Sequence, residues 1–299
     1  MNKDYLHKYL VLKRQARVIT VFSTNTVRKY CRGLKLISPT ATAAMGRLIS
    51  ATLMMGSTLK GNERIMVTVD GGGKIGPIRA ESDAFGNVRA FASNPEATAP
   101  LNEYGNLNVS ELVGNDGYLQ VRKQLNMKEP FIGTCELVSG EIGEDISYYY
   151  GTSEQTPTIV ALGVLLNKDG TCKQAGGFLI QLLPNASQEA YDFLDKILHE
   201  VKSVSKLITE AKSSDNLVYK LFDEAELIFE YPCHYKCTCS ITKTKALLTQ
   251  LSKDELNEDI AKGEGLDVTC NFCGKVYHID TNGLKKVLEM KEKRLFNIK

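Results

Sequence analysis

Five of the eight cysteines in this chain fall within residues 233–273, and four of these five form two close pairs. One residue separates Cys237 from Cys239, two separate Cys270 from Cys273, and 30 residues lie between the pairs. Two close pairs of thiols at such a distance can deliver four thiolates to one tetrahedral zinc ion. We therefore predict that these four cysteines bind one zinc per chain.

The second pair is the stronger half of this pattern. Gly274, directly after Cys273, permits the tight turn in which backbone N–H groups face the sulfurs. The C-x-C half is rarer at zinc sites, and two alternatives stay open: His278 could replace one sulfur, or Cys233 could compete for a place. Four cysteine ligands leave no open position on the metal, so we expect a structural site and not a hydrolytic one.

The rest of the sequence lacks recognisable catalytic machinery. The four histidines lie in no nucleophile motif, and the motifs of zinc proteases, phosphate loops and serine hydrolases are missing. Gly71–Gly76 formally matches a dinucleotide-binding loop, but that loop requires a helix to follow, and residues 77–80 have the pattern of a strand. We predict a hairpin turn there and a protein that is not an enzyme. An oxidoreductase that uses C-x-x-C is a weak alternative, because the thioredoxin-like βαβ context is missing.

Composition predicts a protein of the cytoplasm. The 299 residues are 43% hydrophobic and 24% charged, and the net charge of +2 gives no general reason to expect nucleic acid or membrane as a partner. The first ten residues lack the apolar segment of a secretory signal, and the apolar stretch 41–59 contains Arg47, which favours a buried helix over a membrane span. The cysteines then belong to a reducing compartment, where they rest as thiols or metal ligands.

The order of elements predicts an α+β fold with three parts. Residues 1–185 carry hairpin signals, such as 167–170, and no βα alternation, so we expect an N-terminal core domain of antiparallel sheet and helices. We expect its strands at 17–23, 64–70, 88–92, 117–125, 130–139, 158–166 and 171–183, its long helices at 40–59 and 145–154, and a short helical patch near 110–112.

A helical linker is predicted for residues 186–230. Ser187 can cap a helix whose apolar side chains recur at helical spacing as far as Ile208, and a second short helix follows residues 213–216. This segment is amphipathic, charged and too thin for a core of its own. We expect either a connector packed on the core domain or a segment that detaches and presents its apolar face to other proteins.

A small C-terminal zinc-binding domain is predicted for residues 231–299. Ser252 and Glu255 form a capping-box pattern for a helix that Gly263 can end, strands flank the second cysteine pair, and a lysine-rich helix begins at Asp280 or Thr281. A segment of about 70 residues has a marginal core, whereas zinc bound by cysteines supplies about 10–16 kcal/mol of folding free energy. Oxidants attack thiolates, so loss of zinc on oxidation should unfold this domain.

The chain resembles the redox-regulated heat-shock chaperones, the thirty-three-kilodalton chaperonin family. The four-cysteine pattern carries the resemblance, which extends over essentially the whole chain through Ser38–Arg47, Gly71–Ala80, Phe85–Arg89 and Gly176–Phe178. The remaining cysteines, Cys31, Cys135 and Cys172, stand alone in strand or helix contexts and are most simply buried residues.

The resemblance implies an ATP-independent holdase that oxidative stress activates. In the reduced, zinc-bound form the chaperone is inactive. By the same resemblance, oxidation would join Cys237 to Cys239 and Cys270 to Cys273, expel zinc, unfold the redox-switch domain and destabilise the linker. The active form, commonly a homodimer, binds unfolding client proteins and prevents their aggregation. Cys233 could exchange into the first disulfide.

A zinc-containing nucleic-acid-binding protein is the alternative of a different class. In that case zinc would shape a basic C-terminal helix whose Lys285, Lys286 and Lys291 contact phosphate. It requires salt-dependent binding to RNA or DNA, which replacement of the three lysines by alanine would abolish.

Overall fold

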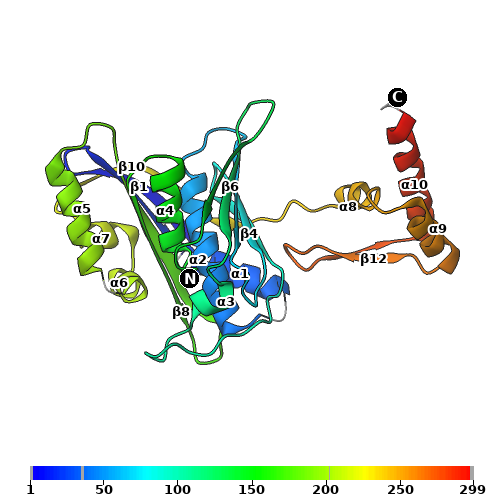
Figure 1. Ribbon diagram of the computed structural model, residues 1–299, viewed down its shortest axis with the longest axis horizontal. Coiled ribbons are helices and arrows are strands. Elements are labelled where there is room, and N and C mark those ends of the chain that lie inside the picture. Colours follow the sequence, from blue (N-terminus) through cyan, green and yellow to red (C-terminus); the bar gives the residue numbers. More distant parts are fainter. Residues whose placement is uncertain (1–2, 35–36, 202, 297–299) are drawn as a thin grey trace. The chain divides into compact units, whose positions relative to one another are not determined.

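The chain folds into two compact units, Met1–Lys236 and Cys237–Lys299. The computed structural model describes residues 3–34, 37–201 and 203–296, and Figure 1 shows the elements of each unit. The sequence predicts three parts, with boundaries at residues 185 and 230. That division stays a prediction. Each unit is described by itself.

Two antiparallel sheets form the frame of the first unit. The five-stranded sheet has the strand order β10 (Ala225–Pro232), β1 (Tyr5–Val11), β2 (Ala16–Phe22), β9 (Cys172–Leu182) and β8 (Thr158–Leu166). The six-stranded sheet has the order β11 (His234–Tyr235), β5 (Asn87–Ala92), β4 (Ile78–Asp83), β3 (Arg64–Asp70), β6 (Tyr118–Gln124) and β7 (Phe131–Glu136). All neighbours are antiparallel except β11 and β5, which confirms the predicted α+β class.

Helix α2 (Pro39–Gly56) is the centre of this unit and packs on strands of both sheets. The Oγ atom of Ser38 accepts a hydrogen bond from the N–H of Ala41 at 3.0 Å, and Pro39 occupies the first turn, as the sequence predicts. Nearly every residue of α2 is buried. Such a helix needs small side chains all round, because two sheets approach it closely.

The glycine-rich segment after β3 is a hairpin connection and not a nucleotide loop. Strand β4 pairs antiparallel with β3, and no helix begins between them. Gly72 and Gly76 adopt positive φ, whereas Gly71 and Gly73 lie so close to backbone carbonyls of 112–114 that a Cβ atom would come within 2.2–2.4 Å of them. These carbonyls belong to the end of the short helix α3 (Val109–Val113).

The other helices of the unit cover the sheets. Helix α1 (Thr24–Leu34) packs on β9 and α2, and helix α4 (Gly143–Ser153) packs on β7 and β8. In the predicted linker, α5 (Gln188–Glu200), α6 (Val204–Ala211) and α7 (Ser214–Tyr219) are separate helices. The single helix expected from residue 187 as far as Ile208 is therefore wrong, because the chain leaves the helical conformation at Val201 and Ser203 starts α6.

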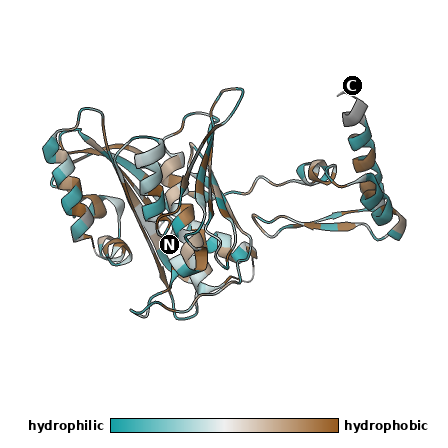
Figure 2. Cartoon of the chain, in the orientation of Figure 1, coloured by the Kyte–Doolittle hydropathy of each residue, from teal (hydrophilic) through white to brown (hydrophobic). Residues whose placement is uncertain are grey.

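The linker covers one face of the five-stranded sheet with apolar side chains. Figure 2 shows hydrophobic and hydrophilic residues interleaved along α5, as an amphipathic helix requires. Buried side chains of the linker helices and the segment after α7 meet buried side chains of β1, β2 and β9; on the linker side these are Ala190, Leu194, Ile197, Ala211, Leu217, Val218 and Phe222. The chain then becomes strand β10, which pairs with β1.

The second unit contains three helices and a two-stranded sheet. These are α8 (Ile241–Leu248), α9 (Lys253–Lys262), β12 (Leu266–Thr269), β13 (Val276–Ile279) and α10 (Thr281–Phe296). The predicted capping box is present at Ser252 and Glu255, and Gly263 ends α9 with φ +77°. The core is small and consists of Leu248, Leu256, Tyr277, Ile279, Leu284 and Val287.

Candidate metal centre

Two turns of the second unit bring the predicted cysteines together. Cys237 and Cys239 lie just before α8, whose N-cap is Ser240, and Cys270 and Cys273 lie in the turn between β12 and β13. In that turn the N–H of Gly274 donates to the carbonyl of Cys270 at 2.8 Å, and Gly274 has φ +70°. The tight turn predicted from the C-x-x-C-G pattern is therefore present.

The four sulfurs form a compact cluster. All of them lie within 4.8 Å of one another, and the two closest contacts are 3.7 Å between Cys237 and Cys270 and 3.5 Å between Cys239 and Cys273. A zinc–sulfur bond of about 2.3 Å in a tetrahedron requires sulfur–sulfur edges of about 3.8 Å. The donors and their spacing fit zinc without rearrangement of the backbone.

Hydrogen bonds and burial shift the pKa values of the thiols in the cluster in different directions. Burial alone would raise the pKa of Cys239, but hydrogen bonds from Tyr277 and from the other three thiols lower it to about 7. Burial raises the pKa of Cys237 and of Cys273. Of these three thiols, Cys239 is therefore the one whose thiolate form is favoured, and thiolates are the form that binds a metal.

Tyr277 is a residue of the site that the motif did not reveal. Its hydroxyl lies 3.1 Å from the Sγ atom of Cys239 and donates to it, which raises the pKa of the phenol to about 12. The amino group of Lys275 lies 4.9 Å from the centre of the Tyr277 ring. The only sequence signal was the alternation of β13, which places Tyr277 and Ile279 on the same face.

The two alternative ligands lie elsewhere. Within the described part of the chain, the cluster of possible ligands holds the four cysteines and neither His278 nor Cys233. His278 follows Tyr277 on the strand, so it faces the other side, and its Nδ1 atom is 2.7 Å from Asp267. Cys233 belongs to the first unit, is only 4% exposed, and its N–H donates to the carbonyl of Asp4.

The three isolated cysteines are poor nucleophiles. Cys172 is buried, as predicted, and burial raises its pKa to about 12. Cys31 and Cys135 are only partly buried; burial raises both pKa values, that of Cys135 to about 11. Thiolates are the reactive form of cysteine, so these side chains should react slowly with oxidants near neutral pH.

The lysines of α10 do not all point to a phosphate-binding face. The amino group of Lys291 donates to the carbonyls of Thr249 and Leu251, at 3.1 and 2.8 Å, and so helps to fix α10 to the rest of its unit. Lys285 and Lys286 are exposed. The nucleic-acid alternative requires three lysines to contact phosphate. One of them, Lys291, is already hydrogen-bonded within its own unit.

The comparisons with known proteins agree along the whole chain. Residues 4–280 match the family described as Hsp33 protein. The chain is 40% identical over 291 residues to the 33 kDa chaperonins of Staphylococcus aureus strains Newman and COL, which covers 97% of this chain and 99% of each relative. It also resembles the crystal structure of the 33 kDa chaperonin from Thermotoga maritima, with a TM-score of 0.90, 30% identity, and coverage of 98% of this chain and 100% of that one.

The helices in the described ranges are too short or too polar to cross a membrane. This finding agrees with the buried position of α2, the most apolar helix candidate in the sequence.

Proposed function

The chain belongs to the Hsp33 family, whose members are chaperones and not enzymes, and we propose that it is a cytoplasmic holdase switched on by oxidation. Membership in this family implies that the chain binds unfolded proteins as clients. The observation that carries the proposed switch is the cluster of four thiols within 4.8 Å of one another. It sits in a unit whose described residues form a small apolar core around Leu256, Leu284 and Val287.

In the reduced state, Cys237, Cys239, Cys270 and Cys273 would hold one zinc. When bound, zinc supplies a four-thiolate crosslink worth about 10–16 kcal/mol of folding free energy, comparable to the whole stability of a typical domain, about 5–15 kcal/mol. Tyr277 supports this state by its hydrogen bond to Cys239. The switch unit is then folded only while its thiols are reduced.

Oxidation removes the metal donors. A thiolate attacks the oxidant, for example hydrogen peroxide, and becomes a sulfenic acid; a second thiol displaces water and forms the disulfide, so two thiols lose two electrons and peroxide becomes two waters. We propose the pairs Cys237–Cys239 and Cys270–Cys273. After unfolding, the members of these pairs stay two and three positions apart in the sequence, whereas those of the cross pairs Cys237–Cys270 and Cys239–Cys273 are 33 and 34 positions apart.

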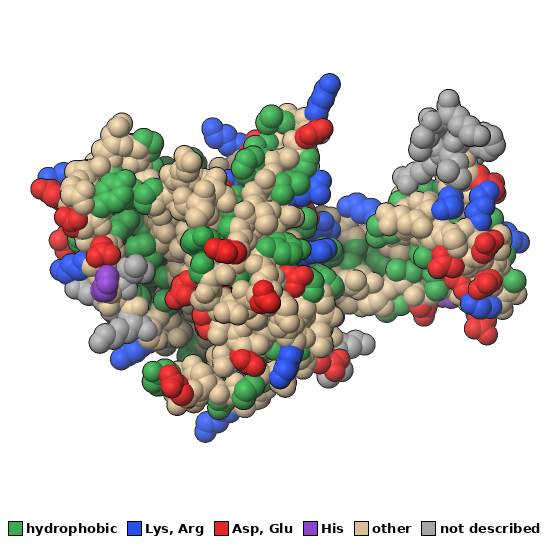
Figure 3. All heavy atoms as spheres, viewed as in Figure 1, with side chains coloured by type: hydrophobic (Ala, Val, Ile, Leu, Met, Phe, Trp, Pro, Cys, Tyr) green, Lys and Arg blue, Asp and Glu red, His purple; other side chains and the backbone are tan. Residues whose placement is uncertain are grey.

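Release of the linker would then expose apolar surface for clients. In the first unit, α5 to α7 bury one face of the sheet formed by β1, β2 and β9. Undocking would uncover both partners of this contact. Further apolar side chains are already exposed: Leu227, Ile228 and Phe229 on β10, and Tyr118, Phe131 and Ile132 on the β6–β7 hairpin, where Figure 3 shows hydrophobic side chains at the surface. We propose that the active form is a homodimer.

The test combines metal content, thiol count and chaperone activity. The reduced chain should contain one zinc and eight free thiols, and peroxide with mild heat should release the zinc and remove four thiols. The oxidised protein, but not the reduced one, should suppress aggregation of a thermally unfolding client, and light scattering should give the mass of a dimer.

A variant with Cys239→Ser should lack the switch, and Cys135→Ser is the matched control because Cys135 lies outside the cluster. Equal protection of the client by the reduced, zinc-loaded protein would contradict the proposal.

A further inference from the structure

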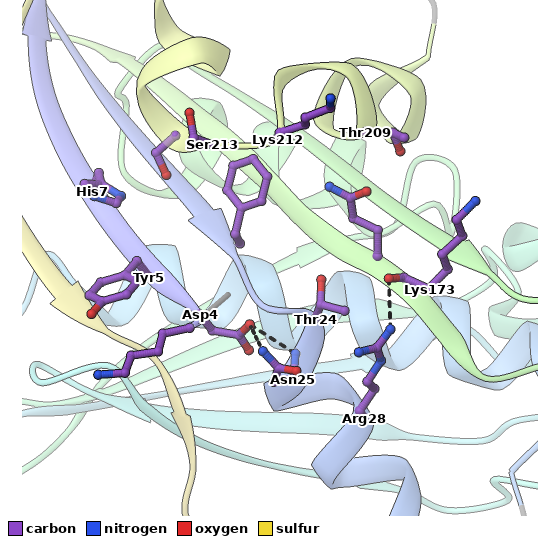
Figure 4. Close-up of a pocket in the computed structure, with 14 residues that line it drawn as sticks. Asp4, Tyr5, His7, Thr24, Asn25, Arg28, Lys173, Thr209, Lys212 and Ser213 are labelled. Atoms are coloured by element: carbon purple, nitrogen blue, oxygen red, sulfur yellow. Dashed lines mark hydrogen bonds between the residues drawn. The ribbon is translucent and has the colours of Figure 1, made fainter. Parts of the chain in front are cut away.

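A cavity of about 580 Å³ in the first unit lies where the linker meets the sheet. The linker contributes Thr209 and residues 212–214 from α6, α7 and the turn between them. The rest of the lining comes from residues 3–7 around the start of β1, the end of β2, the first turns of α1, and residues 173–174 of β9. Figure 4 shows the labelled linker residues on one side of the cavity and those of α1 and β1 on the other.

The lining is strongly cationic. Four of its side chains carry a fixed positive charge: Lys3, Arg28, Lys173 and Lys212. Figure 4 shows that the cations Lys212, Lys173 and Arg28 come from three different elements around the cavity. None of the three lysines forms an ion pair with any carboxylate in the described ranges. Such a group of unpaired cations in one cavity attracts anions.

Asp4, the acidic residue of the lining, does not neutralise these cations. Its Oδ1 atom accepts from the N–H and the side-chain amide of Asn25, at 3.1 and 3.0 Å, and its Oδ2 atom accepts from the N–H of Thr26 at 2.6 Å. The carboxylate therefore compensates the positive end of the α1 dipole. Four cations and this one carboxylate give the lining a net charge of +3, which remains for a ligand.

Two side chains in the cavity, Arg28 and His7, are held in place by neighbouring groups and still have polar atoms without a partner among the described residues. The Nε atom of Arg28 donates to the carbonyl of Cys172 at 2.7 Å, and one terminal nitrogen donates to that of Lys173 at 3.2 Å. The guanidinium is thus held in place by neutral carbonyls, with three N–H donors left over. The Nδ1 atom of His7 is buried and has no hydrogen-bond partner among the described residues, while its Nε2 atom lies 3.4 Å from Glu230.

We infer that this cavity binds a small anion with at least two adjacent phosphate groups. One phosphate carries a charge of about −1.5 to −2 near neutral pH and would leave part of the net charge of +3 uncompensated, whereas two or three linked phosphates match it. The volume lies within the range of about 300–1,000 Å³ of small-molecule sites. The hydroxyl of Ser213 also lines the cavity; its oxygen accepts from the N–H of Asn216, and its proton is given to no acceptor among the described residues.

The ligand would clamp the linker to the core. Lys212 and Ser213 belong to the linker, whereas Lys3 precedes β1 and Arg28 and Lys173 belong to α1 and β9, so one anion would contact both sides. A ligand that binds only the docked state lowers the open population by the factor 1 + [L]/Kd, about 100-fold at 100 times Kd. The regulatory consequence, slower activation, rests on the proposed function; the binding site itself does not.

Calorimetry on the reduced, zinc-loaded full chain tests the site, with inorganic triphosphate as the probe at low salt. We expect inorganic triphosphate and ATP to bind and AMP and inorganic phosphate to bind at least tenfold more weakly. Equal binding of triphosphate and ATP would assign recognition to the phosphates, and tighter binding of ATP would show that the nucleoside is also bound. No binding of triphosphate, or equal binding of inorganic phosphate, overturns the proposal.

Charge-matched variants separate the site from general electrostatic attraction. The double variant Lys173→Gln and Lys212→Gln should bind triphosphate 10–100-fold more weakly, whereas Lys128→Gln with Lys168→Gln, two exposed lysines outside the cavity, should bind as the wild type does. An equal loss in both double variants would contradict the site.

Hydrogen exchange tests the clamp. Saturating triphosphate should slow exchange of the α6 and α7 amides in the wild type and not in the cavity variant. Binding without this protection would overturn the clamp. Because both readouts use the reduced protein and no client, a failure of the holdase proposal would leave them unaffected.

Discussion

The hydroxyl of Tyr277 lies 3.1 Å from the sulfur of Cys239, so a side chain of β13 in the second unit donates a hydrogen bond to a proposed metal ligand. Partners of this kind orient a ligand and tune its basicity. Cys239 belongs to the less common C-x-C half of the site, and this contact ties it to β13, close to the other cysteine pair.

Removal of this hydroxyl should weaken metal binding. Tyr277→Phe keeps the ring in the core but leaves the Cys239 thiolate with one donor fewer, and we expect zinc affinity to fall about 10–100-fold. Competition with a chromophoric chelator measures this affinity. Tyr104→Phe, at a tyrosine that is 79% exposed in the first unit, is the control. Unchanged affinity in Tyr277→Phe would show that the hydrogen bond does not matter for zinc.

Zinc removal under reducing conditions should unfold the second unit alone. Its apolar core is too small to replace about 10–16 kcal/mol of metal-linked stability. Hydrogen exchange after chelation should show lost protection in α8 to α10 and retained protection in α2 and β9. Full protection of α9 and α10 in metal-free, reduced protein would contradict the structural role of the metal.

The bond between Tyr9 and Asp215 should hold the linker on the core. The hydroxyl of Tyr9, on β1, donates to the Oδ1 atom of Asp215, on α7, at 2.5 Å. Tyr9→Phe leaves this carboxylate without that donor and should destabilise the docked linker by about 1–3 kcal/mol. Peroxide with heat should then activate the variant faster, measured by client protection over time. Tyr191→Phe, on α5 of the same linker, is the control because Tyr191 is 43% exposed; equal rates in both variants would argue against a role for Tyr9.

Lys8 should give the first unit a distinct pH dependence. Burial, and then the charge of Arg17, lowers the pKa of Lys8 from 10.5 to about 8. Because the folded pKa lies below the unfolded one, the charged form is disfavoured on folding: the cost is fully present below about pH 8 and disappears as the pH rises toward 10.5. The side chain is partly exposed, so solvent screening reduces this cost to about 1–2 kcal/mol.

Comparison with Lys8→Met isolates this effect. The carbonyl of Ser57, which accepts from Lys8, also accepts from the hydroxyl of Tyr231, so the variant leaves no unpaired carbonyl. We expect the variant to be more stable than the wild type at pH 7, and the difference to shrink between about pH 8 and 10.5. Denaturant unfolding at several pH values measures it, and a difference that does not change with pH would contradict the assigned cost.

Local signals predicted the elements that local interactions determine. Ser252, Glu255 and Gly263 fix both ends of α9 by contacts within the helix itself, and Ser38 does the same for the start of α2. The cluster of four cysteines could also be predicted from the sequence, because their spacing indicates that they converge whatever the fold of the residues between the two pairs.

Elements that depend on distant partners were missed. Helix α1 receives its capping carboxylate from Asp4, about twenty residues earlier in the chain, and β10 is a strand because β1 offers it a free edge. Nothing within residues 225–232 signals that edge. The cationic cavity escaped prediction for the same reason: Lys3, Arg28, Lys173 and Lys212 come from four separate segments.

The pairing of β1 with β10 determines when, during synthesis, the edge of the five-stranded sheet can be closed. The ribosome makes residues 12–224 between β1 and its outer neighbour β10, so the edge of β1 stays open while this whole segment is synthesised. At about 5–20 residues per second, this wait lasts roughly ten to fifty seconds. During that time the nascent chaperone itself carries an open sheet edge, and it is closed before Cys270 and Cys273 exist to bind a metal.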